Sequence, residues 1–203
     1  MTGRLIAFEG GEGSGKSTQA RKLAERIPGA VLTHEPGDTA LGARLRGLLL
    51  DLDGIDITPR TEALLMAADR AQHVAEVIRP ALEVGRTVIT DRYVGSSVAY
   101  QGFGRQLDPR EVADLSEWAT GALAPDLVLL LEVPLSVSRD RTGGPRDRLE
   151  GAGAEFHRRV HDGFLQQATL DSERWAVVDG TRPEDEVADQ VWQVVAMKFP
   201  ELT

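Results

Sequence analysis

The feature that most constrains this sequence is a glycine-rich run close to its start. Residues 10–17 read Gly-Gly-Glu-Gly-Ser-Gly-Lys-Ser, with an apolar run at Leu5–Phe8 before them and a helical pattern at Lys16–Ile27 after them. Glycine tolerates backbone conformations that let several N–H groups point at one anion, and the start of the following helix adds its positive end. In this context of strand, loop and helix, the run predicts a phosphate-binding loop at the edge of a sheet, and a chance glycine-rich turn is the weaker interpretation.

The side chains at the end of the loop indicate which ligand it holds. Lys16 is placed to reach the β- and γ-phosphates of a nucleoside triphosphate, and the hydroxyl of Ser17 is placed to ligate Mg²⁺. We therefore expect ATP with Mg²⁺ to bind here. The residues expected to contact it are Gly10, Gly11, Glu12, Gly13, Ser14, Gly15, Lys16, Ser17 and Thr18.

Short apolar runs alternate with longer helical patterns along the rest of the chain, which is typical of a parallel α/β sheet whose strands are covered on both faces. The expected strands are Leu5–Phe8, Ala30–Thr33, Thr87–Thr90, Leu127–Glu132 and Ala176–Val178. The expected helices are Lys16–Ile27, Leu41–Leu50, Arg60–Val84, Pro109–Thr120, Leu135–Arg141, Ala154–Leu170 and Pro183–Phe199. We predict an α/β P-loop NTPase fold in three layers, a five-stranded parallel sheet flanked by helices, as a single domain over residues 1–203.

The composition argues against several classes of function. The chain contains no Cys, which removes disulfides, thiolate metal sites and a cysteine nucleophile, and its formal net charge of −9 disfavours broad binding to nucleic acid. No apolar run approaches the roughly 20 residues that span a bilayer, and the start lacks the pattern of a signal peptide. We expect a cytoplasmic protein that acts on small molecules, with no nucleic-acid or membrane partner.

The phosphate loop alone leaves three classes open: a small-molecule kinase, a GTPase switch and an ATPase that moves a partner. A guanine-specific switch needs an Asn-Lys-x-Asp motif, and this chain contains no Asn. The expected strand Thr87–Thr90 leads instead into Asp91 and Arg92. At the C-terminal edge of a parallel sheet, where ligands bind, a carboxylate for Mg²⁺ beside an Arg for a second phosphate favours transfer between two phosphorylated substrates over a surface ion pair.

Several segments together resemble the thymidylate kinase family, and they cover nearly the whole chain. Besides the phosphate loop they are Glu-Pro-Gly-Asp-Thr at 35–39, Leu-Leu-Met-Ala-Ala-Asp-Arg at 64–70, Asp-Arg-Tyr at 91–93, Ser-Ser-Val-Ala-Tyr-Gln-Gly at 96–102 and Arg-Asp-Arg-Leu-Glu at 146–150. The resemblance implies a nucleoside monophosphate kinase that transfers the γ-phosphoryl group of ATP to dTMP, giving dTDP and ADP in dTTP synthesis. The alternatives are a P-loop kinase for another small acceptor and a non-catalytic ATP-binding switch protein.

The resemblance also implies an acceptor site. Glu12 would accept a hydrogen bond from the 3′-hydroxyl of dTMP, Arg70 would bind the thymine edge, and Arg92 would clamp the 5′-phosphate. Ser97 would contact the base, and Tyr100 would pack beneath the sugar. The remaining expected contacts are Glu35, Pro36, Arg46, Met66 and Gln101.

Around the transferring phosphoryl group, the resemblance implies Lys16, Arg92 and Asp91 as catalytic residues, with Ser17 and Asp91 holding Mg²⁺. The phosphate loop carries no basic residue between its framing glycines, which is the pattern of the bacterial subtype, where the catalytic Arg lies in a mobile lid.

The lid itself corresponds to a charged segment rich in Arg, Gly and Asp at about residues 139–153. A closing lid excludes water and brings positive charge onto the transferring group. Arg148 is the expected catalytic residue of this segment, followed by Arg141 and Arg146. A solvated charged loop is the alternative interpretation.

Three residues depart from the family pattern. Met66 stands where a Phe usually stacks on thymine, His34 replaces an Arg, and Asp38 replaces a Gly. A thioether covers a ring face without the stacking of an aromatic ring. These departures bear on affinity and selectivity for dTMP, and not on the class of reaction.

The expected helices Leu41–Leu50 and Arg60–Val84 are richly apolar for a small sheet protein. Members of the family pair through such helices, so the resemblance implies a homodimer. Trp118 is expected to be a core or interface aromatic.

Overall fold

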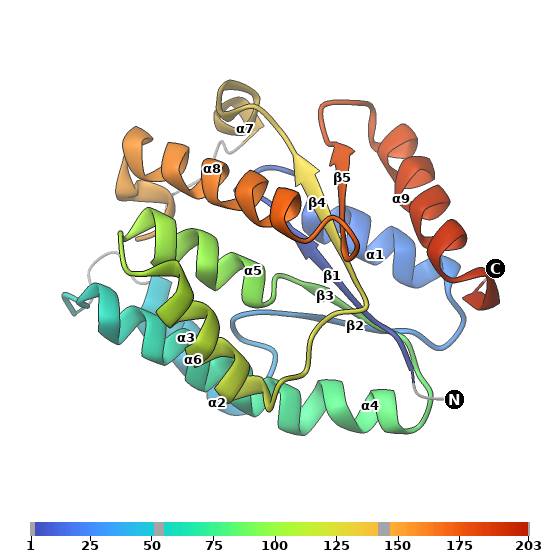
Figure 1. The fold of residues 1–203 in the computed structure, drawn as a ribbon, viewed down its shortest axis with the longest axis horizontal. Helices are drawn as coiled ribbons and strands as arrows, with labels where there is room; N and C mark the ends of the chain where they lie inside the picture. The colour runs from blue at the N-terminus through green and yellow to red at the C-terminus, as the bar shows by residue number, and fades with distance from the viewer. Residues whose placement is uncertain (1–2, 51–54, 142–146, 203) are drawn as a thin grey trace.

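The computed structural model describes residues 3–50, 55–141 and 147–202 of the chain (Figure 1). At its centre is a parallel sheet of five strands in the order β2-β3-β1-β4-β5. The strands are β1 (Leu5–Glu9), β2 (Val31–His34), β3 (Val88–Asp91), β4 (Leu127–Glu132) and β5 (Trp175–Asp179). The predicted sheet is confirmed, and each strand end lies within one residue of its expected position.

Helices cover both faces of the sheet and give the predicted three layers (Figure 1). Ile6 and Phe8 of β1 pack toward α1 (Lys16–Arg26) and α9 (Glu184–Lys198) on one face, while Leu5 and Ala7 belong to the core on the other. The other face carries most of the remaining helices. These helices are α2 (Ala40–Leu50), α3 (Pro59–His73), α4 (Arg79–Glu83), α5 (Val94–Ser97), α6 (Pro109–Thr120), α7 (Leu135–Arg141) and α8 (Ala154–Leu170), with the π-helical segments η1 (Val74–Ile78) and η2 (Val98–Gly104) and the short 3-10 turn η3 (Glu150–Ala152). The 3-10 turn η4 (Pro200–Leu202) follows α9 and packs with it on the first face.

The long helix predicted at Arg60–Val84 is confirmed as α3, η1 and α4 in one run. Its start is fixed by Thr58, whose side chain accepts a hydrogen bond from the backbone three residues further on. Glu62, Met66 and Arg70 follow at intervals of four residues, so they share one face of α3, and all three are buried.

One helical segment was not expected from the sequence. The stretch formed by α5 and η2 is rich in Gly and Ser, which are poor helix formers, so local propensity does not indicate a helix there. Tertiary packing holds the segment in place, because its glycines let α8 approach closely. A Cβ on Gly104 would lie 2.6 Å from a ring atom of Phe156 on α8.

The segment predicted as a lid, residues 139–153, is described in part. The helix α7 leads into it and η3 follows it, whereas residues 142–146, Arg146 among them, lie outside the described residues. Its movement therefore stays a prediction. Within the described ranges, no helix is long and apolar enough to cross a membrane.

Candidate active site

The phosphate loop connects β1 to α1 at the C-terminal edge of the sheet. Gly10, Gly13 and Gly15 have φ angles of 142°, 67° and 91°, a region that residues with side chains rarely adopt. A Cβ on Gly10 would also lie 2.7 Å from the carbonyl oxygen of Leu131. No side chain among the described residues caps α1, so its first turn offers backbone N–H groups to a ligand. The loop therefore has the conformation of an anion cradle.

Lys16 is buried beneath this loop and bonds to it. Its Nζ donates to the carbonyl oxygen of Gly11 at 2.7 Å and to Ser14 Oγ at 3.3 Å. Burial lowers the pKa of Lys16 to about 8, and the positive charge of Arg92 acts in the same direction, whereas Glu12 opposes the shift. A buried ammonium group whose described hydrogen-bond partners are neutral oxygens is suited to bind a phosphate.

Ser17 and Asp91 supply oxygen ligands beside the loop. The hydroxyl of Ser17 donates to Asp91 Oδ2, while Asp91 Oδ1 is buried and has no hydrogen-bond partner in the part of the chain that the structure describes. Hydroxyl and carboxylate oxygens, completed by phosphates and waters, are the ligands that Mg²⁺ prefers. The described residues contain no group of three or more His, Cys, Asp or Glu that could hold a metal. The pair thus fits a Mg²⁺ ion that takes its other ligands from a bound nucleotide.

Glu12, Arg92 and Tyr100 meet where the loop borders a neighbouring cavity. The Arg92 guanidinium pairs with the Glu12 carboxylate and lies 5.1 Å from the centroid of the Tyr100 ring, and the Tyr100 hydroxyl donates to Glu12 Oε1 at 3.2 Å. Arg92 holds the pKa of Glu12 at about 2, although burial opposes this shift. The cluster therefore keeps one anion and one cation at the boundary between two ligand sites.

A second carboxylate holds the backbone behind Arg92. Glu9 is buried at the end of β1 and accepts from the backbone N–H groups of Tyr93 and Ser96 at 3.0 Å each and from the Ser96 hydroxyl at 2.6 Å. Arg92 Nη1 in turn donates to Ser96 Oγ at 3.1 Å. Burial raises the pKa of Glu9 to about 7. These bonds fix a turn in which Arg92 has a φ of 73°, which non-glycine residues rarely adopt.

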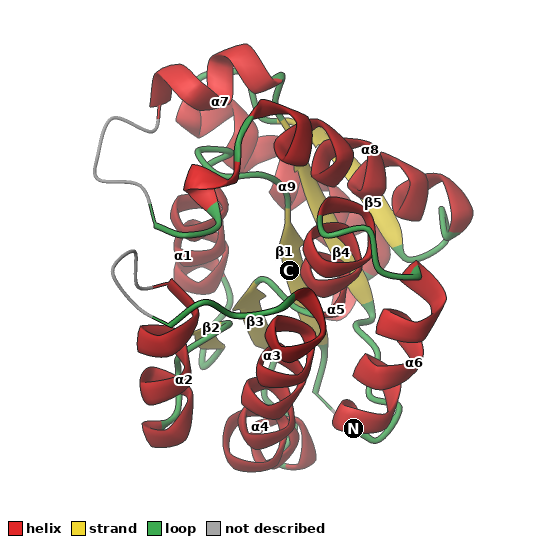
Figure 2. Ribbon diagram, turned by 90° about the vertical axis from the view of Figure 1, so that its left-hand side faces the viewer, coloured by secondary structure: helices red, strands yellow, loops and turns green. Residues whose placement is uncertain are grey.

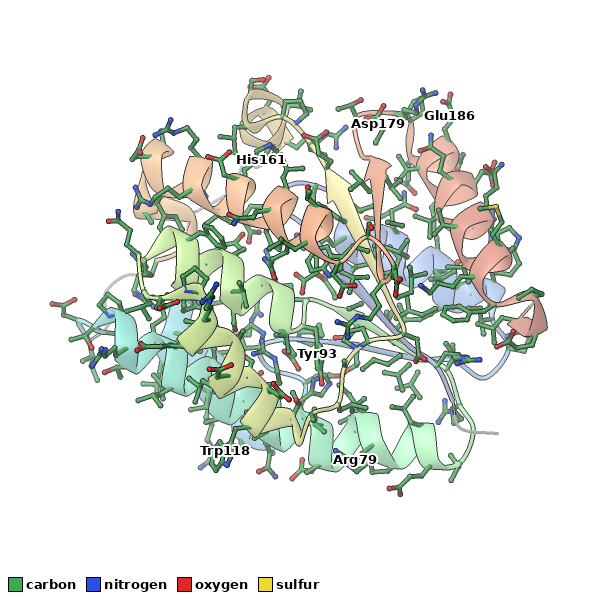
Figure 3. The ribbon with its side chains drawn as sticks, viewed as in Figure 1. Arg79, Tyr93, Trp118, His161, Asp179 and Glu186 are labelled. Atoms are coloured by element: carbon green, nitrogen blue, oxygen red, sulfur yellow. The ribbon has the colours of Figure 1, made fainter. Side chains whose placement is uncertain are left out.

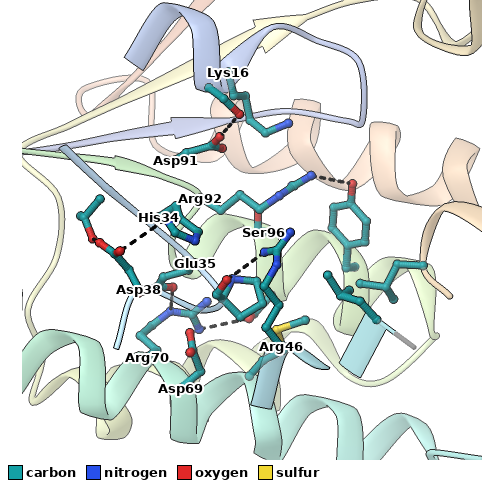
Figure 4. Close-up of a pocket in the computed structure, with 18 of the residues that line it drawn as sticks. Lys16, His34, Glu35, Asp38, Arg46, Asp69, Arg70, Asp91, Arg92 and Ser96 are labelled. Carbon is teal, nitrogen blue, oxygen red and sulfur yellow. Dashed lines mark hydrogen bonds and ion pairs between the residues drawn. The ribbon is translucent and has the colours of Figure 1, made fainter. Parts of the chain in front are cut away.

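A cavity of about 530 Å³ runs from the phosphate loop to α3, within the range of small-molecule sites. Figure 4 shows Lys16 and Asp91 at one end and Asp69 and Arg70 at the other. The structure brings every predicted acceptor residue to this cavity: Glu12, Glu35, Pro36, Arg46, Met66, Arg70, Arg92, Ser97, Tyr100 and Gln101.

Arg70 is 2% exposed and is held from several sides. Its Nε donates to Glu35 Oε2 at 2.7 Å, Nη1 donates to the hydroxyls of Ser97 at 3.0 Å and Ser116 at 3.3 Å, and Nη2 donates to the Tyr93 carbonyl oxygen at 3.0 Å. A guanidinium has five N–H donors, so these bonds leave one for a ligand. The base-reading role predicted for Arg70 would use that remaining donor.

The loop after β2 is tied to α3 through Glu35. Besides Arg70, Glu35 contacts His73, whose Nδ1 lies 2.9 Å from Oε1. His73 is itself buried. Further along the loop, Arg46 Nη1 donates to the Pro36 carbonyl oxygen at 2.8 Å.

The three departures from the family pattern all line the cavity. Asp38 accepts from the hydroxyl of Thr33, and its Oδ1 lies 3.7 Å from His34 Nδ1. Met66 is buried on α3. Each departure is therefore placed to contact a ligand of this cavity.

The two described arginines of the segment predicted as a lid, Arg141 and Arg148, each bond to other parts of the protein. Arg148 Nη2 donates to Glu62 Oε2 at 2.6 Å and its Nε donates to the Leu49 carbonyl oxygen at 2.9 Å, while Arg141 Nη1 donates to the carbonyl oxygen of Gly180 at 2.9 Å. A catalytic role for Arg148 requires it to leave Glu62, and that role stays a prediction.

Sequence reasoning did not single out two acidic residues of this region. Asp69 lines the cavity and accepts from the Gly37 backbone N–H at 3.1 Å, and burial raises its pKa to about 6. Glu62 lies behind the cavity. It precedes Met66 by four residues and Arg70 by eight, and this helical spacing was the signal that could have placed it on the same face.

An anion cradle with a buried Lys, a hydroxyl–carboxylate pair suited to Mg²⁺ and an adjoining cavity lined by Arg92 define a P-loop kinase. The chain belongs to the thymidylate kinase family, because the family model described as Thymidylate kinase matches residues 8–191.

Individual relatives agree with this assignment. The chain is 46% identical to a thymidylate kinase of Bifidobacterium longum (strain DJO10A), with full coverage of both chains. It is 50% identical to a thymidylate kinase of Leifsonia xyli subsp. xyli (strain CTCB07), over 93% of this chain and 92% of the relative. A crystal structure of thymidylate kinase from Ehrlichia chaffeensis superposes with a TM-score of 0.80 at 31% identity, covering 97% of this chain and 100% of that one.

Proposed function

We propose that this chain transfers the γ-phosphoryl group of ATP to dTMP, giving dTDP and ADP. One observation carries the proposal: Glu12 and Arg92 belong to the phosphate-loop end of the site and also line the acceptor cavity, so two phosphorylated substrates would meet there. Membership of the thymidylate kinase family supports dTMP as the acceptor. A cytoplasmic location is part of the same proposal, because nucleotides are made and used there.

At the donor end, the backbone of the phosphate loop and Lys16 would bind the β- and γ-phosphates of ATP. Lys16 would exchange its bond to the Gly11 carbonyl oxygen for the phosphates. Ser17 and Asp91 would hold Mg²⁺, which when bound neutralises charge on these phosphates and orients them. The protein groups are thus arranged to hold the donor still while the second substrate approaches.

At the acceptor end, Arg92 would bind the 5′-phosphate of dTMP and partly release Glu12. The freed Glu12 carboxylate would accept from the 3′-hydroxyl, and Tyr100 would pack beneath the sugar. The remaining N–H of Arg70 would donate to a carbonyl oxygen of thymine, with Met66 against the base. Phosphoryl transfer needs little covalent chemistry from the protein, so this positioning and charge carry the rate.

The test is to measure ADP release with ATP and Mg²⁺ in the presence of dTMP, dUMP, dCMP, AMP or GMP. We expect dTMP to give the highest kcat/KM. A preference for AMP or dCMP would contradict the choice of acceptor. ATP binding without stimulation by any of these acceptors would instead favour a switch protein.

We also propose that the chain forms a homodimer through α2, α3 and α6, which lie next to one another in one layer (Figure 2). Large apolar side chains on these helices are exposed: Leu48 by 49%, Leu64 by 58% and Trp118 by 81%. Figure 3 shows Trp118 directed away from the protein. Such exposure supports an interface. Sedimentation should give twice the mass of the chain, reduced to one copy by Leu64→Glu, and a monomeric unmodified protein would contradict the proposal.

A further inference from the structure

Glu62 is a buried charge whose three partners come from two other parts of the chain, the end of η2 and the segment before η3. The residue is 0% exposed on α3. Its Oε1 accepts from Gln101 Nε2 at 2.8 Å, its Oε2 accepts from Arg148 Nη2 at 2.6 Å, and Arg105 Nε lies 3.2 Å from both oxygens. Two guanidinium groups compensate the charge of the carboxylate and hold it in place.

This contact determines which way the Gln101 amide points. An ionised carboxylate accepts hydrogen bonds and cannot donate them, so the group that Gln101 turns toward Glu62 must be its NH₂. Gln101 also lines the acceptor cavity, and no described residue donates to its Oε1. A flipped amide would set its carbonyl oxygen against the Glu62 carboxylate, two acceptors without a proton between them. Gln101 therefore presents its carbonyl oxygen, a hydrogen-bond acceptor, to the cavity.

We propose that Glu62 is a positioning residue that makes the site specific for thymine over cytosine by fixing the orientation of Gln101. This inference rests on dTMP as the acceptor substrate. Thymine carries a hydrogen on N3 and donates it, whereas N3 of cytosine carries a lone pair and only accepts. The Gln101 carbonyl oxygen bonds the first base and repels the second. Glu62 acts on this choice through Gln101 and does not itself line the cavity.

Arg70, the other residue proposed to bind the edge of the base, presents a hydrogen-bond donor where Gln101 presents an acceptor. Its one remaining N–H is a donor, which suits the O4 carbonyl of thymine and opposes the amino group that cytosine carries on the same carbon, C4. Arg70 is a donor in any orientation, because a guanidinium has no acceptor. Of Arg70 and Gln101, only Gln101 can exchange a donor for an acceptor by flipping its amide, so it is the residue of this pair that needs a fixed partner.

The test is Glu62→Gln. The substitution keeps the size of the side chain, but the new amide can donate a hydrogen bond as well as accept one. A second amide at position 62 presents either end to Gln101, so Gln101 becomes free to turn its NH₂ toward the cavity. We expect the ratio of kcat/KM for dTMP to kcat/KM for dCMP to fall by about tenfold or more, because the cost of an unpaired polar group in the cytosine complex is relieved. Both constants are measured on the full-length protein with ATP and Mg²⁺.

Two further variants separate specificity from damage to the fold. Gln101→Leu should lower the same ratio, and adding Glu62→Gln to it should change the ratio no further. Glu76→Gln makes the same carboxylate-to-amide change at an exposed position of the same long helix, and it should leave the ratio unchanged.

The outcomes that overturn the inference differ from those that overturn the proposed function. Equal losses for dTMP and dCMP in Glu62→Gln would show a merely structural role. An unchanged ratio in Gln101→Leu would overturn the inference even if Glu62→Gln fails to fold. Failure of the unmodified protein to phosphorylate dTMP would overturn the proposed function itself.

Discussion

The donor end and the acceptor cavity of this site are built in different ways. The donor end is one contiguous run, residues 10–17, in which the backbone forms most of the binding surface. The acceptor cavity is formed by side chains from the loop after β2, from α3 and from the α5–η2 segment. A local motif therefore defines the donor end, whereas the acceptor end depends on the fold and on buried partners behind each side chain.

The two ends also differ in how their cations are satisfied. Lys16 at the donor end is buried with a lowered pKa, and its hydrogen bonds to described residues go to neutral oxygens, the Gly11 carbonyl and the Ser14 hydroxyl. Arg70 at the acceptor end is paired with the Glu35 carboxylate at 2.7 Å and is bonded to neighbouring hydroxyls. In the proposed function, the donor end would gain charge compensation when ATP binds, whereas the side chains of the acceptor end are already paired without a ligand.

The largest expected effect comes from removing the cation of the donor end. Lys16→Ala should lower kcat by about a hundredfold to a thousandfold, since a preorganised group that stabilises the transferring charge is lost. Steady-state turnover with saturating ATP and dTMP measures this effect. The melting temperature should not fall, because the substitution relieves the burial of a charged group.

The matched control is Lys22→Ala, which removes a Lys on the same helix that pairs at the surface with Glu184 and Asp185. It should leave kcat unchanged. Near-normal turnover in Lys16→Ala would contradict the role given to the Lys16 charge, because the donor end would then bind phosphate through its backbone alone.

The same contrast explains what the sequence could predict. The glycine pattern around Lys16 and the apolar strands are local signals, and they predicted the loop, the parallel sheet and its edges. Glu9 carries no local signal, and the helical spacing of Glu62 indicates only the face that it shares with Met66 and Arg70. The importance of both carboxylates arises from partners more than 35 residues away, Ser96 and Gln101. The family resemblance predicted which side chains line the acceptor cavity, but not the carboxylates that orient them.

A smaller effect is expected from raising the pH, and it should be larger for ATP at the donor end than for dTMP at the acceptor end. Because the pKa of Lys16 is lowered to about 8, raising the pH through this value removes the ammonium proton and weakens attraction for phosphate. In the free enzyme, kcat/KM for ATP should fall by up to about tenfold per pH unit above pH 8. Glu9 and Asp69, with pKa values of about 7 and about 6, titrate below this window.

Measuring kcat/KM for ATP from pH 7.5 to about pH 9.5 at constant ionic strength tests this expectation. Binding of dTMP in the absence of ATP should change less over the same range, because Arg92 keeps its charge. Its pKa lies above the usual range, since Glu12 and nearby carboxylates outweigh the effect of burial. A flat profile for ATP would show that Lys16 stays charged.

The smallest expected effect concerns Met66 in the acceptor cavity. Met66 lines the cavity from α3, between Glu62 and Arg70 on one helix face, where a thioether gives a base only a soft contact. Met66→Phe should lower KM for dTMP by about twofold to tenfold through ring stacking, with kcat and KM for ATP unchanged. Met197→Phe, at a position 83% exposed on α9, is the control that should alter neither constant. An unchanged KM for dTMP would show that the Met66 side chain does not contact the base. An increased KM would show that the cavity has no room for an aromatic ring at this position.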